Sequence, residues 1–263
     1  MKIALVGYGK MGRLIEQRLL EKGSEVLVVV DPTLQPDADL PSGAAVYTTL
    51  ENAVKGAAGK SLKDVDAVIE YTCPDAAVEN LLFLAREKIP VVTGTTGWYD
   101  KLPEVEKAVN TAGASLVWAS NFSLGVNLFY QIAVCAAKLL DPFAEYDVAG
   151  IETHHNKKAD APSGTAKTLV EQVLAQMTRK KKAIYGTLER KPEADEIHCA
   201  SLRLGSVPGT HSLFFDSAAD TIEITHTARS REGFAAGSVL AAQWLIAKKR
   251  IGVFTVENVL KEF

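Results

Sequence analysis

The 263-residue sequence has few cysteines and no excess of basic charge. Its three cysteines, Cys73, Cys135 and Cys199, are odd in number and far apart, and they include no Cys-x-x-Cys pair. This spacing argues against a disulfide framework and against a zinc knuckle. Lysine and arginine number 29 against 32 aspartates and glutamates, which gives a net charge of −3. A nucleic-acid-binding protein usually has a basic excess, so we expect no nucleic-acid partner.

Long apolar runs are also absent. The apolar stretch before Gly7 is too short for the core of a signal peptide. No later run approaches the roughly 20 residues that cross a bilayer. We therefore expect a cytoplasmic protein with no membrane partner. With 47% hydrophobic and 23% charged residues the composition is that of a globular protein. At roughly 150 residues per domain, the length allows one large or two modest domains.

The first 120 residues or so alternate between short apolar runs and amphipathic segments. The expected strands are Lys2–Val6, Glu25–Val30, Asp66–Tyr71, Pro90–Thr93 and Ser115–Ala119, and the expected helices are Met11–Lys22, Asp75–Lys88 and Leu102–Thr111. Strands of four to six residues that alternate with helices are typical of a parallel sheet with right-handed crossovers.

The pattern changes after Asn121. The expected helices are Leu124–Leu140, Ser163–Arg179 and Gly233–Lys248, and the expected strands are Asp147–His155, Glu196–Arg203, His211–Asp216 and Asp220–Ala228. Strands gathered in this way predict a second domain of α+β type. The fold class is therefore α/β: a Rossmann-like parallel-sheet domain over 1–122, completed by 234–263, and an α+β domain with an open mixed sheet over 123–233. We expect the basic run at 179–182 to cover a solvated helix end.

A glycine-rich motif follows the first expected strand and opens the first expected helix. It reads Gly7-Tyr8-Gly9-Lys10-Met11-Gly12 and fits G-x-G-x-x-G. In this context the motif is typical of dinucleotide binding, because the glycines let the backbone and a helix N-terminus approach a pyrophosphate. The alternative is a structural glycine turn in an α/β domain.

Asp31 ends the second expected strand, where a carboxylate can accept hydrogen bonds from both ribose hydroxyls. Because a 2′-phosphate there would meet like charge, and because Pro32 follows instead of an arginine, Asp31 favours NADH without excluding NADPH. Two polar segments also end strands of the same sheet, Gly94-Thr95-Thr96 and Ala119-Ser120-Asn121-Phe122. We expect both to line the nicotinamide side of the cofactor site, although such residues are also ordinary in turns.

The densest chemistry lies between Glu152 and Ala166. His154 and His155 are adjacent at a strand end, Lys158 follows shortly after, and Ser163-Gly164-Thr165 opens a helix. A histidine near lysines can act as a general acid, and a lysine with a helix N-terminus can hold carboxylates. Adjacent histidines on an extended segment point to opposite sides, so we expect no metal site. The alternative is a polar loop with a helix capped by Ser163.

The segment from His154 to Ala166 (HHNKKADAPSGTA), with the glycine motif and the stretch Asn121–Asn127 (NFSLGVN), resembles the dihydrodipicolinate reductase family. The resemblance covers nearly the whole chain. It implies an NADH- or NADPH-dependent reductase of a cyclic imine dicarboxylate in the diaminopimelate route to lysine, usually a homotetramer. The second domain would then bind substrate and form the oligomer. The glycine motif is one residue shorter than the family's common form.

Residue by residue, the resemblance implies roles for the cluster. His154 matches the family's catalytic histidine and Lys158 its proton-donor lysine, although the sequence alone does not decide which delivers the proton. The positions that match the substrate dicarboxylate site are His155, Lys158, Ser163, Gly164 and Thr165. Two alternatives stay open: another two-domain NAD(P)-dependent dehydrogenase, and a non-catalytic NADH-sensing regulator.

Overall fold

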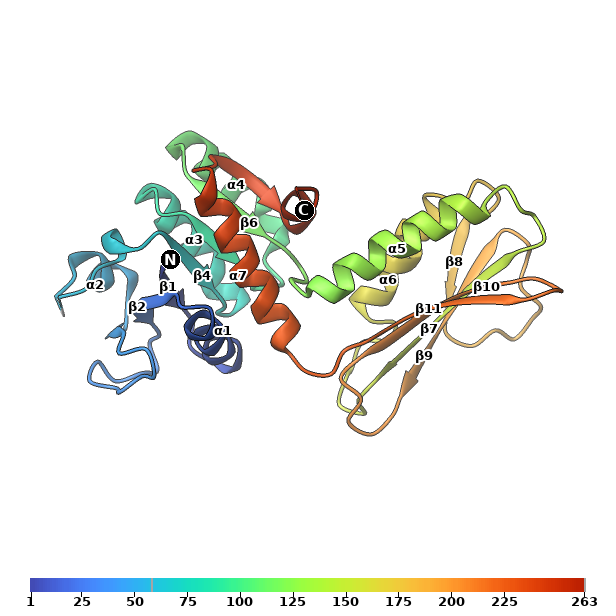
Figure 1. The fold of residues 1–263 in the computed structure, drawn as a ribbon, viewed down its shortest axis with the longest axis horizontal. Helices are drawn as coiled ribbons and strands as arrows, with labels where there is room; N and C mark the ends of the chain where they lie inside the picture. Colours follow the sequence, from blue (N-terminus) through green and yellow to red (C-terminus); the bar gives the residue numbers. More distant parts are fainter. Residues whose placement is uncertain (58, 263) are drawn as a thin grey trace. The chain divides into compact units, whose positions relative to one another are not determined.

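The computed structural model describes residues 1–57 and 59–262, which form two compact units (Figure 1). The first unit contains Met1–Ser123 and the C-terminal segment from Arg231 onward, and the second contains Leu124–Ser230. Among the described residues, no helix has both the length and the apolar character that a membrane span requires.

The first unit is built on a parallel seven-stranded sheet in the order β12-β6-β5-β4-β1-β2-β3. Its strands are β1 (Lys2–Val6), β2 (Glu25–Val30), β3 (Ala45–Tyr47), β4 (Ala67–Glu70), β5 (Val91–Thr93), β6 (Ser115–Trp118) and β12 (Gly252–Thr255). The central strands are buried on both faces, which explains their continuous apolar runs.

Helices cover both faces of this sheet. They are α1 (Lys10–Glu21), α2 (Leu50–Lys55), α3 (Pro74–Arg86), α4 (Leu102–Ala112), α7 (Glu232–Ala247) and α8 (Val256–Leu260), with short 3₁₀ turns at Leu62–Asp64 and Tyr99–Lys101. One apolar core lies between the sheet and the helices α1 and α7, and the other lies under α2, α3 and α4. The C-terminal segment thus completes the first unit, because α7 supplies much of one core and β12 pairs with β6.

The second unit is a five-stranded mixed sheet with two helices on one face. The strands, in the order β11-β10-β7-β9-β8, are β11 (Thr221–Thr227), β10 (Thr210–Asp216), β7 (Asp147–His154), β9 (Glu196–Arg203) and β8 (Lys182–Tyr185). β10 pairs antiparallel with both β11 and β7, while β7, β9 and β8 run parallel. The helices α5 (Leu124–Leu140) and α6 (Gly164–Leu174) share one apolar core with the sheet.

The predicted fold class, a Rossmann-like parallel sheet followed by an α+β unit with a mixed sheet, is confirmed. The short elements β3, α2, β8, β12 and α8 were not expected from the sequence. Three of these are edge strands of three or four residues, whose pairing depends on distant strands rather than on a local pattern.

The basic run at 179–182 does not cover a solvated helix end. α6 already ends at Leu174, and Lys180 is only 5% exposed. The Lys180 ammonium donates to Oδ1 of Asp147 (2.5 Å) and to the carbonyl oxygens of Ala194 and Glu196 (2.9 Å each). A buried ammonium needs such acceptors, so Lys180 ties the start of β7 to the start of β9.

Replacing Lys180 by methionine should lower the free energy of unfolding by about 2–3 kcal/mol, because two carbonyl oxygens lose their donor inside the protein. The matched control is Lys181→Met, one residue along the chain, where the side chain is exposed. That variant should stay within about 0.5 kcal/mol of the wild type. Urea unfolding of both variants measures the difference, and equal stabilities would show that Lys180 has no such structural role.

Candidate active site

The glycine motif forms a tight connection between β1 and α1. Gly7 has φ +88°, and a Cβ there would lie 2.1 Å from the carbonyl oxygen of Tyr71. A Cβ on Gly12 would lie 2.4 Å from the carbonyl oxygen of Gly7, so the helix approaches the loop closely. At Gly9 a Cβ would meet nothing within 4 Å, which leaves the backbone open to a ligand. This arrangement fits a pyrophosphate at the start of α1.

Asp31 is held firmly at the end of β2. Its Oδ2 accepts a hydrogen bond from the backbone N–H of Tyr8 (2.7 Å), and its Oδ1 accepts from the backbone N–H (2.8 Å) and the hydroxyl (2.6 Å) of Thr33. Burial acts to raise the pKa of Asp31, but these hydrogen bonds and the nearby charge of Arg13 outweigh it and leave the pKa lowered. Asp31 is therefore an ionised acceptor. Tyr8 contributes through its backbone, since its side chain is buried and its hydroxyl donates to Glu16.

A pocket of about 520 Å³ lies beside the motif and Asp31. It brings together the predicted residues Gly7, Gly9 and Asp31, and it adds Cys73 and Arg86, which the sequence analysis did not assign to the cofactor. Lys10 is exposed at the first turn of α1, whereas Met11 packs partly against the core. The residues present thus fit the adenosine and pyrophosphate portion of a dinucleotide.

The other two predicted cofactor segments follow β5 and β6, which are neighbours in the sheet. In the first, Thr95 is buried and donates to Glu70 (3.0 Å), while Thr96 is exposed. A Cβ on Gly94 would overlap the ring of Tyr71.

In the second segment the side chains of Ala119 and Phe122 belong to the core, so these two residues can offer a ligand only their backbone. Ser120 is exposed and Asn121 accepts from the backbone N–H of Ser123 (2.8 Å). Neither segment lines the pocket beside Asp31.

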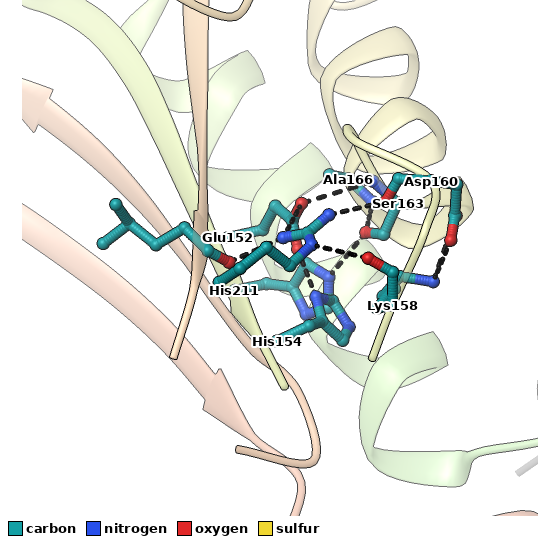
Figure 2. Close-up of polar contacts among 9 residues, drawn as sticks. Glu152, His154, Lys158, Asp160, Ser163, Ala166 and His211 are labelled. Atoms are coloured by element: carbon teal, nitrogen blue, oxygen red, sulfur yellow. Dashed lines mark hydrogen bonds and ion pairs between the residues drawn. The ribbon is translucent and has the colours of Figure 1, made fainter. Parts of the chain in front are cut away.

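In the second unit, a cluster of polar side chains gathers at the end of β7 (Figure 2). Glu152 and His154 lie two residues apart on β7, so both point to the buried face of the sheet. Nδ1 of His154 contacts the Glu152 carboxylate. His211 on β10 pairs in register with Glu152, and its ring lies 5.1 Å from the His154 ring in an edge-on arrangement. The Ser163 hydroxyl lies 3.2 Å from Nε2 of His211.

The remaining predicted residues follow on the loop from 155 to 162 and at the start of α6. The Lys158 ammonium pairs with Asp160 (2.8 Å), and Nδ1 of His155 is buried without a hydrogen-bond partner among the described residues. Ser163 caps α6, because its hydroxyl accepts from the backbone N–H of Ala166 (3.1 Å). Gly164 and Thr165 form the first turn of α6, where backbone N–H groups lack intrahelical acceptors.

Burial and neighbouring cations keep both clustered histidines neutral near pH 7. Burial lowers the pKa of His154, and the charges of Lys158 and Arg203 lower it further, while Glu152 acts in the opposite direction. Burial and the nearby His154 lower the pKa of His211 to about 4. The two imidazoles are therefore hydrogen-bonding groups rather than permanent cations.

Glu152, His154 and His211 are residue types that bind metal ions, and one ligand atom of each lies within 4.8 Å of the others. Their present partners do not favour a cation. The Glu152 carboxylate already pairs with the Arg203 guanidinium (2.9 Å), and the charge of Lys158 acts on the same group of side chains. We therefore assign no metal to this cluster.

Three residues of the cluster received no role from the sequence: Glu152, Arg203 and His211. The period of two along β7 would have placed Glu152 beside His154, since an acidic residue on a buried strand face needs a partner. Arg203 and His211 lie about 50 residues away in sequence on other strands. Nothing in the sequence pattern linked them to the cluster.

The lowered pKa of His211 makes stability depend on pH. The unfolded chain binds a proton near the ordinary pKa of 6.5, and the folded chain only near pH 4. The stability that neutral His211 provides is thus present above about pH 6.5 and is lost as the pH falls toward 4. Between about pH 7.5 and about pH 5, the free energy of unfolding should fall by about 2 kcal/mol more in the wild type than in His211→Gln.

Urea unfolding at the two pH values measures this difference. His198→Gln is the matched control, because His198 is a partly exposed histidine on β9 of the same sheet. His211 is intact in this variant, so the larger fall in stability between the two pH values should remain. If the free energy of unfolding of His211→Gln depended on pH as it does in the wild type, the role given to His211 would be wrong.

Comparison with known proteins identifies relatives along the whole chain. Residues 1–122 match the family model for the N-terminus of dihydrodipicolinate reductase, and residues 125–260 match the model for its C-terminus. A 4-hydroxy-tetrahydrodipicolinate reductase from Christiangramia forsetii is 36% identical over 262 residues, which cover 100% of this chain and 98% of the relative. One from Chromobacterium violaceum is 37% identical and covers 98% and 97%.

Solved structures show the same fold. A dipicolinate-bound dihydrodipicolinate reductase from Paenisporosarcina sp. TG-14 matches with a TM-score of 0.76 at 21% identity, covering 98% of each chain. An amine dehydrogenase from Mycobacterium smegmatis matches with a TM-score of 0.63 at 14% identity, covering 98% of this chain and 95% of that one. The resemblance stated from the sequence motifs is confirmed, and so is the prediction of an NAD(P)H-dependent oxidoreductase. The chain belongs to the dihydrodipicolinate reductase family.

Proposed function

We propose that the chain reduces a cyclic imine dicarboxylate, 4-hydroxy-tetrahydrodipicolinate, to tetrahydrodipicolinate with NADH, in the diaminopimelate route to lysine. The observation that carries this proposal is the cluster at the end of β7. There a neutral histidine, a lysine and a helix N-terminus come together on one unit. These groups suit a ring with two carboxylates that must receive a proton.

The substrate carboxylates would be bound from two directions. The Lys158 ammonium supplies a positive charge, and the first backbone N–H groups of α6 at Gly164 and Thr165 supply hydrogen-bond donors with the positive end of the helix dipole. The Ser163 hydroxyl lies beside them. Nδ1 of His155, which has no partner among the described residues, offers one further polar contact. Two clamped carboxylates would fix the ring in one orientation.

The overall reaction replaces the 4-hydroxyl of the substrate by hydrogen. The hydroxyl leaves as water together with a hydrogen from the neighbouring carbon, which gives a C=C bond conjugated with the C=N bond; a hydride and a proton are then added, and NADH is oxidised to NAD⁺. When bound, the dihydronicotinamide would supply the hydride, which would go to the unsaturated carbon conjugated with the C=N bond. We assign the proton to Lys158, because its ammonium always has N–H donors, whereas His154 is neutral and its Nδ1 faces Glu152. His154 would orient the ring and accept a hydrogen bond at Nε2.

The cofactor residues of the proposal are those of the glycine motif, Asp31, and the two segments after β5 and β6. Asp31 supports NADH over NADPH, because it is an ionised carboxylate held by three hydrogen bonds. The 2′-phosphate of NADPH would meet this charge. Arg13 is a countercharge for Asp31, and it comes from α1 rather than from the residue after Asp31.

For the assembly we propose a homotetramer in the cytoplasm. The sheet of the second unit supports self-association, since its face away from α5 and α6 has partly exposed apolar residues such as Ile151, Leu202 and Phe214. A reducing compartment is supported by Cys73, Cys135 and Cys199, which are free thiols.

The proton-donor assignment predicts the effect of single substitutions. With the cyclic imine made in situ from pyruvate and aspartate semialdehyde, Lys158→Met should reduce kcat for NADH oxidation roughly 100-fold or more, and His154→Gln roughly tenfold or more. The affinity for NADH should stay within about twofold in both, because neither residue belongs to the first unit. Lys157→Met, at the exposed neighbouring lysine, is the matched control and should keep normal turnover. Normal turnover in Lys158→Met would refute the assignment.

The role of Asp31 predicts a change in cofactor preference. Asp31→Asn removes the negative charge and keeps an acceptor for the backbone N–H of Tyr8. The ratio of kcat/KM for NADH to that for NADPH should fall roughly tenfold or more, equivalent to about 1.4 kcal/mol. Asp37→Asn, an exposed aspartate in the same loop, should leave the ratio unchanged. An unchanged ratio in Asp31→Asn would mean that another residue selects the cofactor.

A further inference from the structure

The Glu152 carboxylate is the most enclosed charged group of the β7 cluster, with a side chain that is 0% exposed. It contacts Nδ1 of His154, the Arg203 guanidinium (Oε1 to Nη1, 2.9 Å) and the backbone N–H of Ser163 (3.4 Å). Burial acts to raise the pKa of Glu152, but its hydrogen bonds, among them those with Arg203 and His154, outweigh this effect and leave the pKa lowered, so the carboxylate is ionised. A buried charge of this kind is tolerated only when it is paired. The buried Glu152 carboxylate therefore links His154, the helix-capping residue Ser163 and Arg203 at the end of β9.

Arg203 extends this link to the loop that carries Lys158. It pairs in register with His154 at the ends of the neighbouring strands β9 and β7. While Nη1 meets Glu152, Nε donates to the carbonyl oxygen of Lys158 (3.3 Å) and Nη2 to that of Asp160 (2.5 Å). The guanidinium thus holds the loop by its backbone on both sides of Ala159 and leaves the Lys158 side chain untouched.

We propose that Glu152 and Arg203 are positioning residues, whose ion pair fixes the ring of His154 and the loop of Lys158 as one unit for the reaction. The proposal rests on the function proposed above. Neither residue needs to touch the substrate, since each acts through a residue that does. Loss of the pair would leave both reactive side chains present but no longer held in a common geometry.

The geometry also determines which nitrogen of the His154 ring carries the hydrogen. Because an ionised carboxylate only accepts hydrogen bonds, Nδ1 of His154 must carry a hydrogen. Nε2 is then the atom that remains to meet a ligand. It lies next to Gly209, where a Cβ would stand 2.9 Å from it. The ring is confined by Glu152 at one nitrogen and by the backbone of Gly209 at the other.

The two members of the ion pair, Glu152 and Arg203, carry opposite charges, and both charges act on His154. The groups that face it are Glu152 on β7, Arg203 on β9, His211 on β10 and Lys158 on the loop. Glu152 raises the pKa of His154, whereas Arg203 and Lys158 lower it. Removal of Glu152 and removal of Arg203 should therefore move the titration of His154 in opposite directions. An ion pair elsewhere in the sheet, without contact to His154, would not produce this opposition.

A second ion pair in the same sheet provides the control. Arg190 pairs with the buried carboxylate of Glu196 at the start of β9 (2.6 Å), and Glu196 accepts further hydrogen bonds there. Neither residue is among the groups that act on His154. The variant Glu196→Gln thus reproduces the loss of a buried, arginine-paired carboxylate without the link to His154.

The test follows the ring of His154 by NMR in the free full-length protein labelled with ¹⁵N-histidine. With five histidines in the chain, its signal is assigned by its loss in His154→Gln. The expected result is the Nδ1–H tautomer in the wild type, a titration midpoint that moves to lower pH in Glu152→Gln, and one that moves to higher pH in Arg203→Met. In both variants kcat should fall roughly tenfold or more while KM for NADH is unchanged. Glu196→Gln should alter neither the midpoint nor kcat.

The proposal is overturned if the wild type has the Nε2–H tautomer of His154. It is also overturned if the titration midpoint of His154 moves in the same direction in Glu152→Gln and Arg203→Met, or does not move. If Glu152→Gln does not fold, the test rests on Arg203→Met, in which the titration midpoint of His154 should move to higher pH and kcat should fall. The NMR measurement needs no substrate. A wild type without reductase activity would thus refute the proposed function, while the titration would still decide whether the pair positions His154.

Discussion

The buried carboxylate of Glu152 is the constraint on which the second unit's site depends. Placing a charge on the inner face of a sheet costs several kcal/mol unless partners compensate it. The partners here come from β7, from β9 and from the residue that caps α6. Because each must stay in place to satisfy the carboxylate, three segments distant in sequence hold a single arrangement. That arrangement brings His154, the Lys158 loop and the N-terminus of α6 together.

In the first unit, another buried carboxylate joins the loops at the carboxyl ends of the strands. Glu70 is fully buried at the end of β4 and accepts hydrogen bonds from the hydroxyls of Thr72, Thr93 and Thr95. Burial raises its pKa, and the three hydroxyls oppose that effect. The loops after β4 and β5 are thereby joined at the same sheet edge that carries the glycine motif. Asp31 plays the corresponding part after β2, where it connects Thr33 to the backbone of Tyr8.

The fold class, the central strands and the longer helices of both units followed from the period of their apolar residues, because these segments are buried on one face or on both. The site was only partly predictable. Local motifs indicated the glycine loop, Asp31 and the stretch from His154 to Thr165. Arg203 and His211 reach His154 only through the pairing of β7 with β9 and β10, and such pairing leaves no local pattern. Lys180 was misjudged for the same reason, since its acceptors on Asp147, Ala194 and Glu196 are far along the chain.

The central claim is that the cofactor bound by the first unit reduces the ring bound by the second. Its most direct test is a single-turnover reaction with NADH deuterated at C4, with the cyclic imine as substrate and the product analysed by mass spectrometry. The account predicts tetrahydrodipicolinate that contains one deuterium per molecule when the transferred hydrogen is labelled, and none when the opposite face of C4 is labelled. Product without deuterium from both labelled cofactors, or oxidation of NADH without reduction of the ring, would contradict it.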